Sequence, residues 1–247
     1  MPVAKRARTS YAPRRRRATF RKRVSRKRFT RSKRMAPLPN YRFHRWVTAL
    51  SSVNVSDCTY DLAASVVTQT LTKPTISFSL SFSMDDLPNK TEFTTLFDSY
   101  MITGVMIQIK MLNVPDSIYP TNITPVSGFQ LNNFYPTIWY SPDHDDNGTI
   151  TLAAIKEYAK VRHKVLRPNQ ELSIMLRPTT LQQIYRSAVT TGYAENRRRQ
   201  WLDIAATDIP HYGCKFVIDF EGLTPTSSDS FKFKVNAKYF FACKSVR

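Results

Sequence analysis

Hydrophobic and polar residues alternate with a period of two along three long stretches of this chain. From Thr75 to Met84 every second residue is large and apolar, and serine or threonine stands between. The same alternation runs through 105–111 and 231–241, and in the last stretch Lys or Asn fills four of the polar positions. Because successive side chains of a strand point to opposite faces, each stretch predicts a β-strand that buries one face.

Shorter apolar patterns extend this prediction to an all-β fold. Further strands are predicted at 172–176 and 216–220, and near 46–55, 134–140 and 158–166. Helical spacing is confined to Phe93, Leu96, Phe97 and Tyr100 and to a short segment at 152–158. Loops rich in Pro, Asn, Asp and Ser are predicted at 113–125, 142–149, 178–199 and 223–229. About eight strands with long loops favour a two-sheet sandwich, and the jelly roll fits best.

The charge is concentrated at one end of the chain. The first 56 residues contain no Asp or Glu, and 18 of the first 46 are Arg or Lys. The remaining 191 residues carry 19 basic and 18 acidic side chains, so nearly all of the net charge of +19 lies in the first segment. Such a segment buries too little apolar surface to offset the entropy of ordering it. We therefore expect a disordered basic arm and hinge at 1–45 and a jelly-roll shell domain at 46–247.

The arm has the composition of a nucleic-acid-binding segment. Arg outnumbers Lys by twelve to four through Arg34, and guanidinium groups bind phosphate in a bidentate manner. Tyr11, Phe20 and Phe29 recur among the charges and are suited to stacking on unpaired bases. Phosphate contacts dominate such binding, so base-specific readout is not expected. The residues assigned to nucleic-acid binding are Arg14, Arg15, Arg16, Arg17, Arg21, Lys22, Arg23, Arg26, Lys27, Arg28, Arg31, Lys33, Arg34, Arg42 and Arg45.

A short basic cluster can also direct nuclear import, and the start of the arm contains such clusters. The residues assigned to nuclear localisation are Lys5, Arg6, Arg8, Arg14, Arg15, Arg16 and Arg17. A mitochondrial transit peptide is the alternative, but charge this dense leaves no apolar helical face. No apolar stretch follows the arm that would suit a secretory signal, and none is long enough to span a membrane.

Catalytic and metal-binding patterns are weak. Asp143, His144, Asp145 and Asp146 are the one place where metal-ligand residue types crowd together, and flanking Pro and Asn-Gly indicate an exposed turn. His211 with Asp208 could form a catalytic pair, but no motif supplies a nucleophile. Cys58, Cys214 and Cys243 match neither a disulfide framework nor a zinc site. We expect no enzyme activity, no cofactor and no metal. Arg197–Arg199, before Trp201, is either part of a nucleic-acid-facing surface or a solvated loop tip.

The order of features resembles the capsid proteins of circoviruses, cycloviruses and related small circular single-stranded DNA viruses. Four features carry the resemblance: the Arg-rich start, the strand at 76–84 with Asp85-Asp86-Leu87-Pro88, the segment 97–111 opening on Phe-Asp-Ser-Tyr, and His211-Tyr212-Gly213 with the strand at 235–241. The resemblance implies an eight-stranded jelly roll, a sixty-copy icosahedral shell, an inward-pointing arm on a single-stranded DNA genome, and assembly in the host nucleus.

That resemblance also sets the expected partners. They are the single-stranded DNA genome, other copies of the chain and host nuclear import receptors, together with a host attachment factor that the sequence does not identify. Neither base stacking nor phosphate contact requires a 2′-hydroxyl, so the arm alone does not distinguish DNA from RNA. A capsid protein of a small satellite-like RNA virus and a cellular nucleic-acid-binding protein therefore stay open as alternatives.

Overall fold

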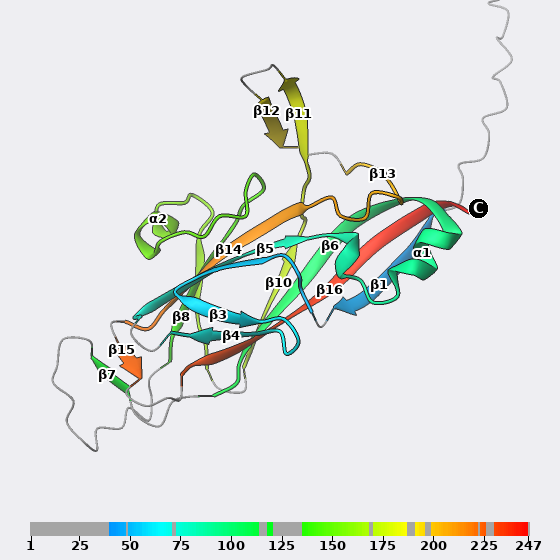
Figure 1. Cartoon of the computed structure of the whole chain (residues 1–247). Coiled ribbons are helices and arrows are strands. Elements are labelled where there is room, and N and C mark those ends of the chain that lie inside the picture. Colours follow the sequence, from blue (N-terminus) through cyan, green and yellow to red (C-terminus); the bar gives the residue numbers. More distant parts are fainter. Residues whose placement is uncertain are drawn as a thin grey trace, which may run out of the picture. The chain divides into compact units, whose positions relative to one another are not determined.

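The computed structural model describes residues 40–47, 49–70, 73–113, 118–120, 135–167, 170–186, 191–195, 199–221, 223–225 and 230–246. The chain divides into two units, Met1–Pro37 and Leu38–Arg247, and all the described residues belong to the second. Two large antiparallel sheets form most of the described part of this unit, as Figure 1 shows.

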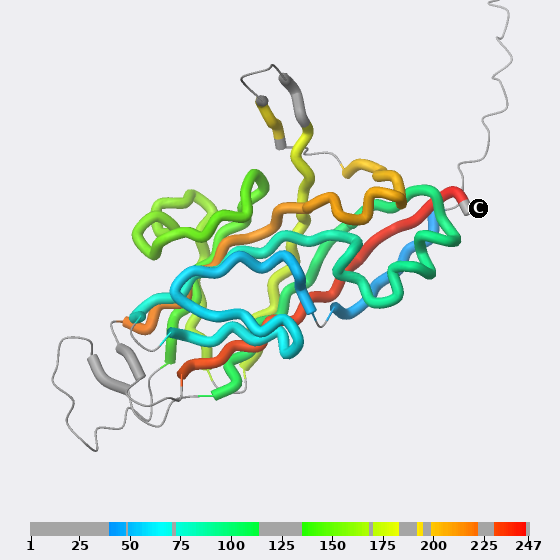
Figure 2. Tube along the Cα trace, in the orientation of Figure 1, coloured from blue at the N-terminus to red at the C-terminus, as the bar shows by residue number. Residues whose placement is uncertain are grey.

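The first sheet is built around a long central pair of strands. β16 (Lys232–Val246) lies between β1 (Tyr41–Val47) and β6 (Phe97–Met111), and β10 (Glu171–Leu176) pairs with the far side of β6. The tube in Figure 2 shows the blue start of the described chain beside its red end, which are β1 and β16. Three short strands complete the sheet: β4 (Val66–Gln69) beside β16, β3 (Cys58–Asp61) beside β4, and β13 (Leu202–Asp203) beside β6.

The second sheet has five strands in the spatial order β2-β5-β14-β8-β9. Their bounds are β2 (Val53–Ser56), β5 (Thr75–Phe82), β14 (His211–Asp219), β8 (Thr137–Pro142) and β9 (Arg162–Val165). When the eight principal strands are numbered along the chain, the two sheets have the orders 1-8-3-6 and 2-7-4-5. That is the strand order of a jelly roll, in which consecutive strands lie in opposite sheets except for the fourth and fifth, which pair with each other. The predicted fold class is confirmed.

The inner faces of both sheets supply the core. Phe78 of β5 stacks on Phe216 of β14 with ring centroids 4.9 Å apart. Phe82 meets the ring of Tyr239 of β16 edge-on at 5.7 Å, which joins the two sheets. The apolar positions of the predicted strands at 75–84 and 231–241 are all buried. The period-two pattern therefore identified the core face of both sheets correctly.

The serine face of β5 is buried too, so the expectation of a half-buried strand is wrong there. Ser77, Ser79 and Ser81 are at most 7 % exposed. A loop lies over them: the Ser79 hydroxyl donates to the Asn147 carbonyl (2.5 Å), and the Ile150 N–H donates to Ser77 Oγ (3.1 Å). Small hydroxyl side chains let a loop backbone approach the sheet and satisfy its polar groups.

Helices are few, as expected, but shorter than the spacing predicts. η1 (Met84–Asp86) and α1 (Lys90–Leu96) lie between β5 and β6, and α2 (Leu152–Lys156) follows β8. The predicted helix through Tyr100 ends at Leu96 because Phe97 and Tyr100 pair with Val246 and Cys243 of β16. Ladder hydrogen bonds to β16 replace the helical ones at that point.

Several element bounds differ from the predictions. The loop expected at 178–199 contains the hairpin of β11 (Leu181–Arg186) and β12 (Thr191–Glu195). The loops expected at 113–125 and 223–229 contain two short paired strands, β7 (Ile118–Pro120) and β15 (Leu223–Pro225). In place of one strand at 46–55 the structure has β1 and β2, and β1 begins inside the segment assigned to the arm and hinge.

Candidate nucleic-acid interface

Most of the residues assigned to nucleic-acid binding and nuclear import lie outside the described residues. These are the basic positions from Lys5 to Arg34. Their roles stay predictions. Arg42 and Arg45 are described, and both lie on β1.

Arg42 and Arg45 lie on opposite faces of β1. Phe43 shares its face with Arg45 and packs against Phe93 of α1 and Phe241 of β16, with centroids 5.2 and 5.6 Å away. The Arg45 guanidinium lies 5.7 Å from the centre of the Phe93 ring. Arg42 is three positions away and points to the outer side of the sheet. The structure therefore separates the two arginines that the sequence analysis grouped.

The outer side of β1 and β16 carries alternating cations and aromatic rings. Trp46 pairs in register with Lys238, and His44 pairs with Phe240. The Lys238 Nζ lies 5.4 Å from the centre of the Trp46 indole and 5.6 Å from the Phe240 ring. Contacts of this length are cation–π interactions. We call the set Arg42, His44, Trp46, Lys238, Phe240 and Lys244 the β1–β16 outer face.

Trp201 extends this surface beyond β6. The Lys244 Nζ lies 4.6 Å from the centre of the Trp201 ring. Arg42, Arg199 and Trp201 line a cavity of about 180 Å³ together with residues of β6 and β16. Of the basic cluster Arg197–Arg199, the described member therefore lies beside the β1–β16 outer face, which favours the first of its two interpretations.

The cations of this face have no acidic partners within the described part of the chain. The ion pairs found there join Lys73 to Asp57, Lys90 to Asp85, and Lys215 to Asp143 and Asp146. Neither β1 nor β16 contains an Asp or Glu. The positive potential of the surface is therefore not cancelled by salt bridges, and an anionic ligand could be attracted to it.

Sequence reasoning found the lysines of 231–241 but interpreted them only as the polar face of a strand. The alternation places Lys232, Lys234 and Lys238 on one side, yet it does not show which strand lies next to them. Trp46 and Trp201 are far from them along the chain. The sequence did contain an indication of a charged surface, because the polar face of this strand carries several lysines and no acidic residue and therefore has a net positive charge.

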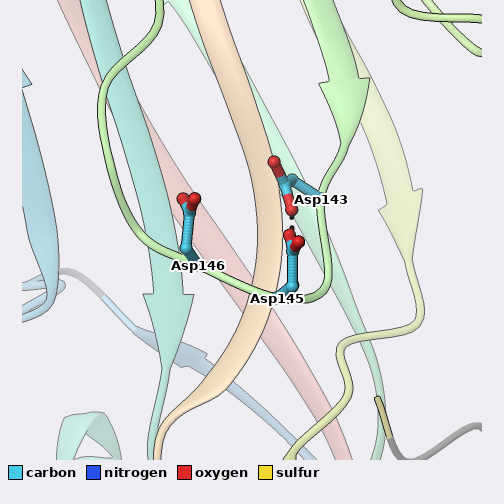
Figure 3. A group of neighbouring side chains, drawn as sticks. All are labelled: Asp143, Asp145 and Asp146. Carbon is cyan, nitrogen blue, oxygen red and sulfur yellow. Dashed lines mark hydrogen bonds between the residues drawn. The ribbon is translucent and has the colours of Figure 1, made fainter. Parts of the chain in front are cut away.

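The second cluster of charged residues surrounds Lys215 of β14. Its Nζ lies 2.8 Å from Asp143 Oδ2 and 2.5 Å from Asp146 Oδ1. Figure 3 shows the carboxylates of Asp143 and Asp145 facing one another, with Asp146 on the other side of β14. The side chains of Lys215 and Asp143 are only 6 % and 8 % exposed. The predicted exposed turn is therefore wrong for Asp143, because the loop folds back over the sheet.

The electrostatics of this cluster follow from burial and pairing. Burial opposes the charge on Lys215, but hydrogen bonds and attraction from Asp143 and Asp146 outweigh it and raise the pKa of the lysine. Burial likewise opposes the charge on Asp143, and hydrogen bonds from Asp145 and Lys215 lower its pKa. The pKa of Asp145 is raised, mainly by the hydrogen bond that Asp145 makes with Asp143. The ammonium of Lys215 compensates the negative charges of Asp143 and Asp146. The cluster is therefore an internal ion pair of the protein.

The remaining catalytic candidates are built into the core. His211 is 5 % exposed, its Nδ1 lies 3.0 Å from the Ile209 carbonyl, and burial lowers its pKa. Burial also raises the pKa of Cys58 and of Cys243 to about 12, and that of Cys214 further. Protonated thiols are poor nucleophiles, and the Nδ1 of His211 is occupied by a backbone carbonyl. In the described residues these groups pack and hydrogen-bond inside the sandwich.

Two sequence features that carried the resemblance have structural roles. The carboxylate of Asp86 is buried between the sheets, where the Tyr239 hydroxyl donates to it (2.6 Å). Gly213 lies at a bulge of β14, and a Cβ there would stand 2.4 Å from the Phe82 ring. Both positions keep β5, β14 and β16 in close contact.

Comparison with known proteins then decides the family. The model of the family described as "Circovirus capsid protein" matches residues 6–247. The chain belongs to the circovirus capsid protein family. A protein of this family is a structural component of the virion, and the recognition made from the sequence is confirmed. This membership also decides against a cellular nucleic-acid-binding protein.

Solved capsid structures are similar to this capsid protein at low sequence identity. The 60-mer BFDV capsid protein has a TM-score of 0.48 at 11 % identity, over 83 % of this chain and 91 % of that one. The structure of Mud crab tombus-like virus has a TM-score of 0.39 at 10 % identity, over 97 % of this chain and 95 % of that one. The structure of Melon necrotic spot virus has a TM-score of 0.41 at 13 % identity, over 84 % of this chain and 56 % of that one. No curated protein sequence matches the chain. Within the described residues, no helix has the length and apolar character needed to cross a bilayer.

Proposed function

We propose that this capsid protein assembles into a sixty-subunit icosahedral shell and packages circular single-stranded DNA through its Arg-rich arm. The observation that carries this proposal is the segregation of charge in a chain of this family: 18 cations in the first 46 residues, and a nearly neutral remainder. Sixty such arms bring on the order of 1,000 positive charges, comparable to the phosphates of a strand of about one to two kilobases. The role is structural and not catalytic.

The jelly roll supports the division of labour between arm and shell. Its two sheets form one rigid core, and β1, which follows the arm, is paired with β16 over seven residues. The arm therefore leads directly into an edge strand of the first sheet and not into a peripheral loop. Tension on a bound strand would be transmitted directly to the core of the subunit.

The test of packaging is an arm from which thirteen of its positive charges are removed. Changing the thirteen cations from Arg14 to Arg34 to Gln is expected to abolish retention of nucleic acid while the shell domain stays folded. Each lost phosphate contact should also reduce the salt slope of single-strand binding by about 0.7. Binding is measured by titration at several salt concentrations, and folding by circular dichroism.

A control variant removes four positive charges from the shell domain instead, at the partly exposed Lys90 and the exposed Lys73, Lys156 and Lys160. That variant is expected to keep both the affinity and the salt slope. Equal binding by the arm variant and the wild type would refute the assignment of the arm. Negative-stain microscopy checks for closed shells, and nuclease typing of the packaged polymer decides between DNA and RNA.

The same arm is proposed to direct nuclear import by binding host import receptors. A reporter fused to residues 1–45 is expected to accumulate in nuclei, and Ala at Arg14, Arg15, Arg16 and Arg17 should reduce the nuclear fraction. The matched control places Ala at Arg26, Lys27, Arg28 and Arg31, which removes the same charge outside the assigned signal. An unchanged distribution for the first variant would exclude those four residues as the main signal. Imaging of the reporter measures the outcome.

A further inference from the structure

The β1–β16 outer face combines exposed aromatic rings with cations that form no ion pair within the described part of the chain. Trp46 is 44 % exposed, and His44 and Arg42 on the same face of β1 are exposed as well. Lys238 and Phe240 of β16 are half-buried beside them, and Trp201 with Lys244 continues the pattern beyond β6. Leaving a tryptophan this exposed forgoes burial energy, which a binding partner can recover.

We propose that this face is a second binding site for single-stranded nucleic acid, at which unpaired bases stack on Trp46 and Trp201. Arg42, Lys238 and Lys244 bind the phosphates between those bases. The inference rests on the proposed function, since it assumes that the chain packages a single strand. It deepens that function by assigning base contacts to the shell domain in addition to the arm.

The chemistry of the surface selects single-stranded nucleic acid over other polyanions. An acidic peptide or a lipid headgroup would use the cations but has no flat ring for the indoles. A duplex presents phosphates but keeps its bases stacked inside. An unpaired strand offers a phosphate and a π-face at every nucleotide, and the alternation of Trp46, Lys238 and Phe240 matches both groups.

The internal cation–π contacts do not block this binding. A base stacked on an aromatic side chain generally contributes more to binding than an exposed cation–π contact contributes to the free protein. A base can therefore displace the ammonium of Lys238 from Trp46, and the flexible lysine can then pair with the adjacent phosphate. The free protein holds the lysine beside the ring, ready for this exchange.

The position of β1 in the chain couples this face to the arm. β1 begins at Tyr41, directly after the basic segment, and Arg42 is its second residue. A strand gripped by the arm is thus held near the outer face, so the second contact is effectively intramolecular. This coupling sets the orientation of the subunit in the shell, because the sheet of β1, β16, β6 and β10 then faces the packaged nucleic acid.

Photo-cross-linking tests the inference with the three tryptophans of the chain. The full-length protein is mixed, before assembly, with a single-stranded oligodeoxynucleotide containing bromodeoxyuridine and is irradiated. Peptide mapping is expected to find cross-links at Trp46 and Trp201. Trp139 is the internal control, because it also lies beneath a lysine, with Lys156 Nζ 4.8 Å from its ring, but on β8 of the other sheet.

Affinity measurements on the full chain complete the test. Trp46→Leu should weaken single-strand binding roughly 5- to 150-fold without changing the salt slope, because a stack is lost and no charge is removed. Lys238→Gln should instead lower the slope by about 0.7. Trp139→Leu should leave affinity and slope unchanged, and circular dichroism checks that each variant is folded.

The outcomes separate this inference from the proposed function. If cross-links map only to residues 1–39 and Trp46→Leu binds as tightly as the wild type, the second site is wrong and packaging by the arm stands. Cross-linking of Trp139 equal to that of Trp46 also overturns the second site. If the full chain binds no single strand at low salt, the proposed function itself fails.

Discussion

Replacing the buried Lys215 with methionine is expected to lower the free energy of unfolding by about 3–5 kcal/mol. The side chain is 6 % exposed, and its ammonium lies between the carboxylates of Asp143 and Asp146. Methionine keeps most of the volume but removes the charge. Asp143, itself only 8 % exposed, then holds a carboxylate without its cationic partner, and that uncompensated charge is what destabilises the fold.

A surface ion pair provides the matched control. Lys90 and Asp85 are paired at 2.9 Å, but their side chains are 43 % and 37 % exposed, so Lys90→Met should cost at most about 1 kcal/mol. The double variant Lys215→Met with Asp143→Asn should recover most of the loss, because no buried charge is left. Urea unfolding of all four proteins gives the comparison. A loss for Lys215→Met no larger than for Lys90→Met would contradict the buried pair.

The pH dependence follows from the directions of the pKa shifts. In the wild type the pKa of Asp143 is lowered, so its contribution to stability is present above the ordinary value of 3.8 and is lost as the pH falls through the depressed pKa. In Lys215→Met burial raises the pKa of Asp143 instead. The carboxyl group is then protonated at a higher pH than in the wild type, so the stability difference between variant and wild type should shrink as the pH falls.

The strands that the sequence predicted well are those whose burial has a period of two. β5 and β16 each bury their apolar positions. The alternation of residues within each strand is enough to show which face meets the core. Pairing depends on residues far apart: β1 and β16 come from opposite ends of the shell domain. Phe97 shows the same dependence on distant residues. Its spacing from Phe93 is helical, but it forms a strand because it pairs with β16.

Burial of polar residues was the harder part to predict. Lys215 and Ser79 are neighbours in register on the outer side of the second sheet, where the pattern predicts solvent. The segment that covers them, around Asp143 and Asn147, has the composition of an exposed turn. Nothing local indicates that such a loop folds back over a sheet. The β1–β16 outer face was missed for a related reason, because Trp46 and Lys238 meet only through strand pairing.

Asp86 connects the two sheets through its carboxylate, and its replacement is expected to be strongly destabilising. Four donors converge on its carboxylate. Oδ1 accepts from the Ser51 N–H (3.0 Å) and hydroxyl (2.5 Å), and Oδ2 accepts from the Ser83 N–H (3.0 Å) and the Tyr239 hydroxyl (2.6 Å). These groups come from the loop after β1, the start of η1 and the middle of β16. One side chain therefore connects both sheets.

Asp86→Asn should lower the free energy of unfolding by about 3–5 kcal/mol. Whichever way the amide is turned, its NH₂ group faces the backbone N–H of Ser51 or of Ser83, and that N–H loses its acceptor. The hydroxyl on the same side must rotate to accept from the amide, so its hydrogen bond to a carboxylate is lost as well. Tyr239→Phe removes one donor and should cost about 1.5–3 kcal/mol. Asp85→Asn, at the adjacent exposed residue, should cost less than about 1 kcal/mol. Denaturant unfolding measures the series, and equal losses for Asp85→Asn and Asp86→Asn would show that the carboxylate of Asp86 does not hold the sheets together.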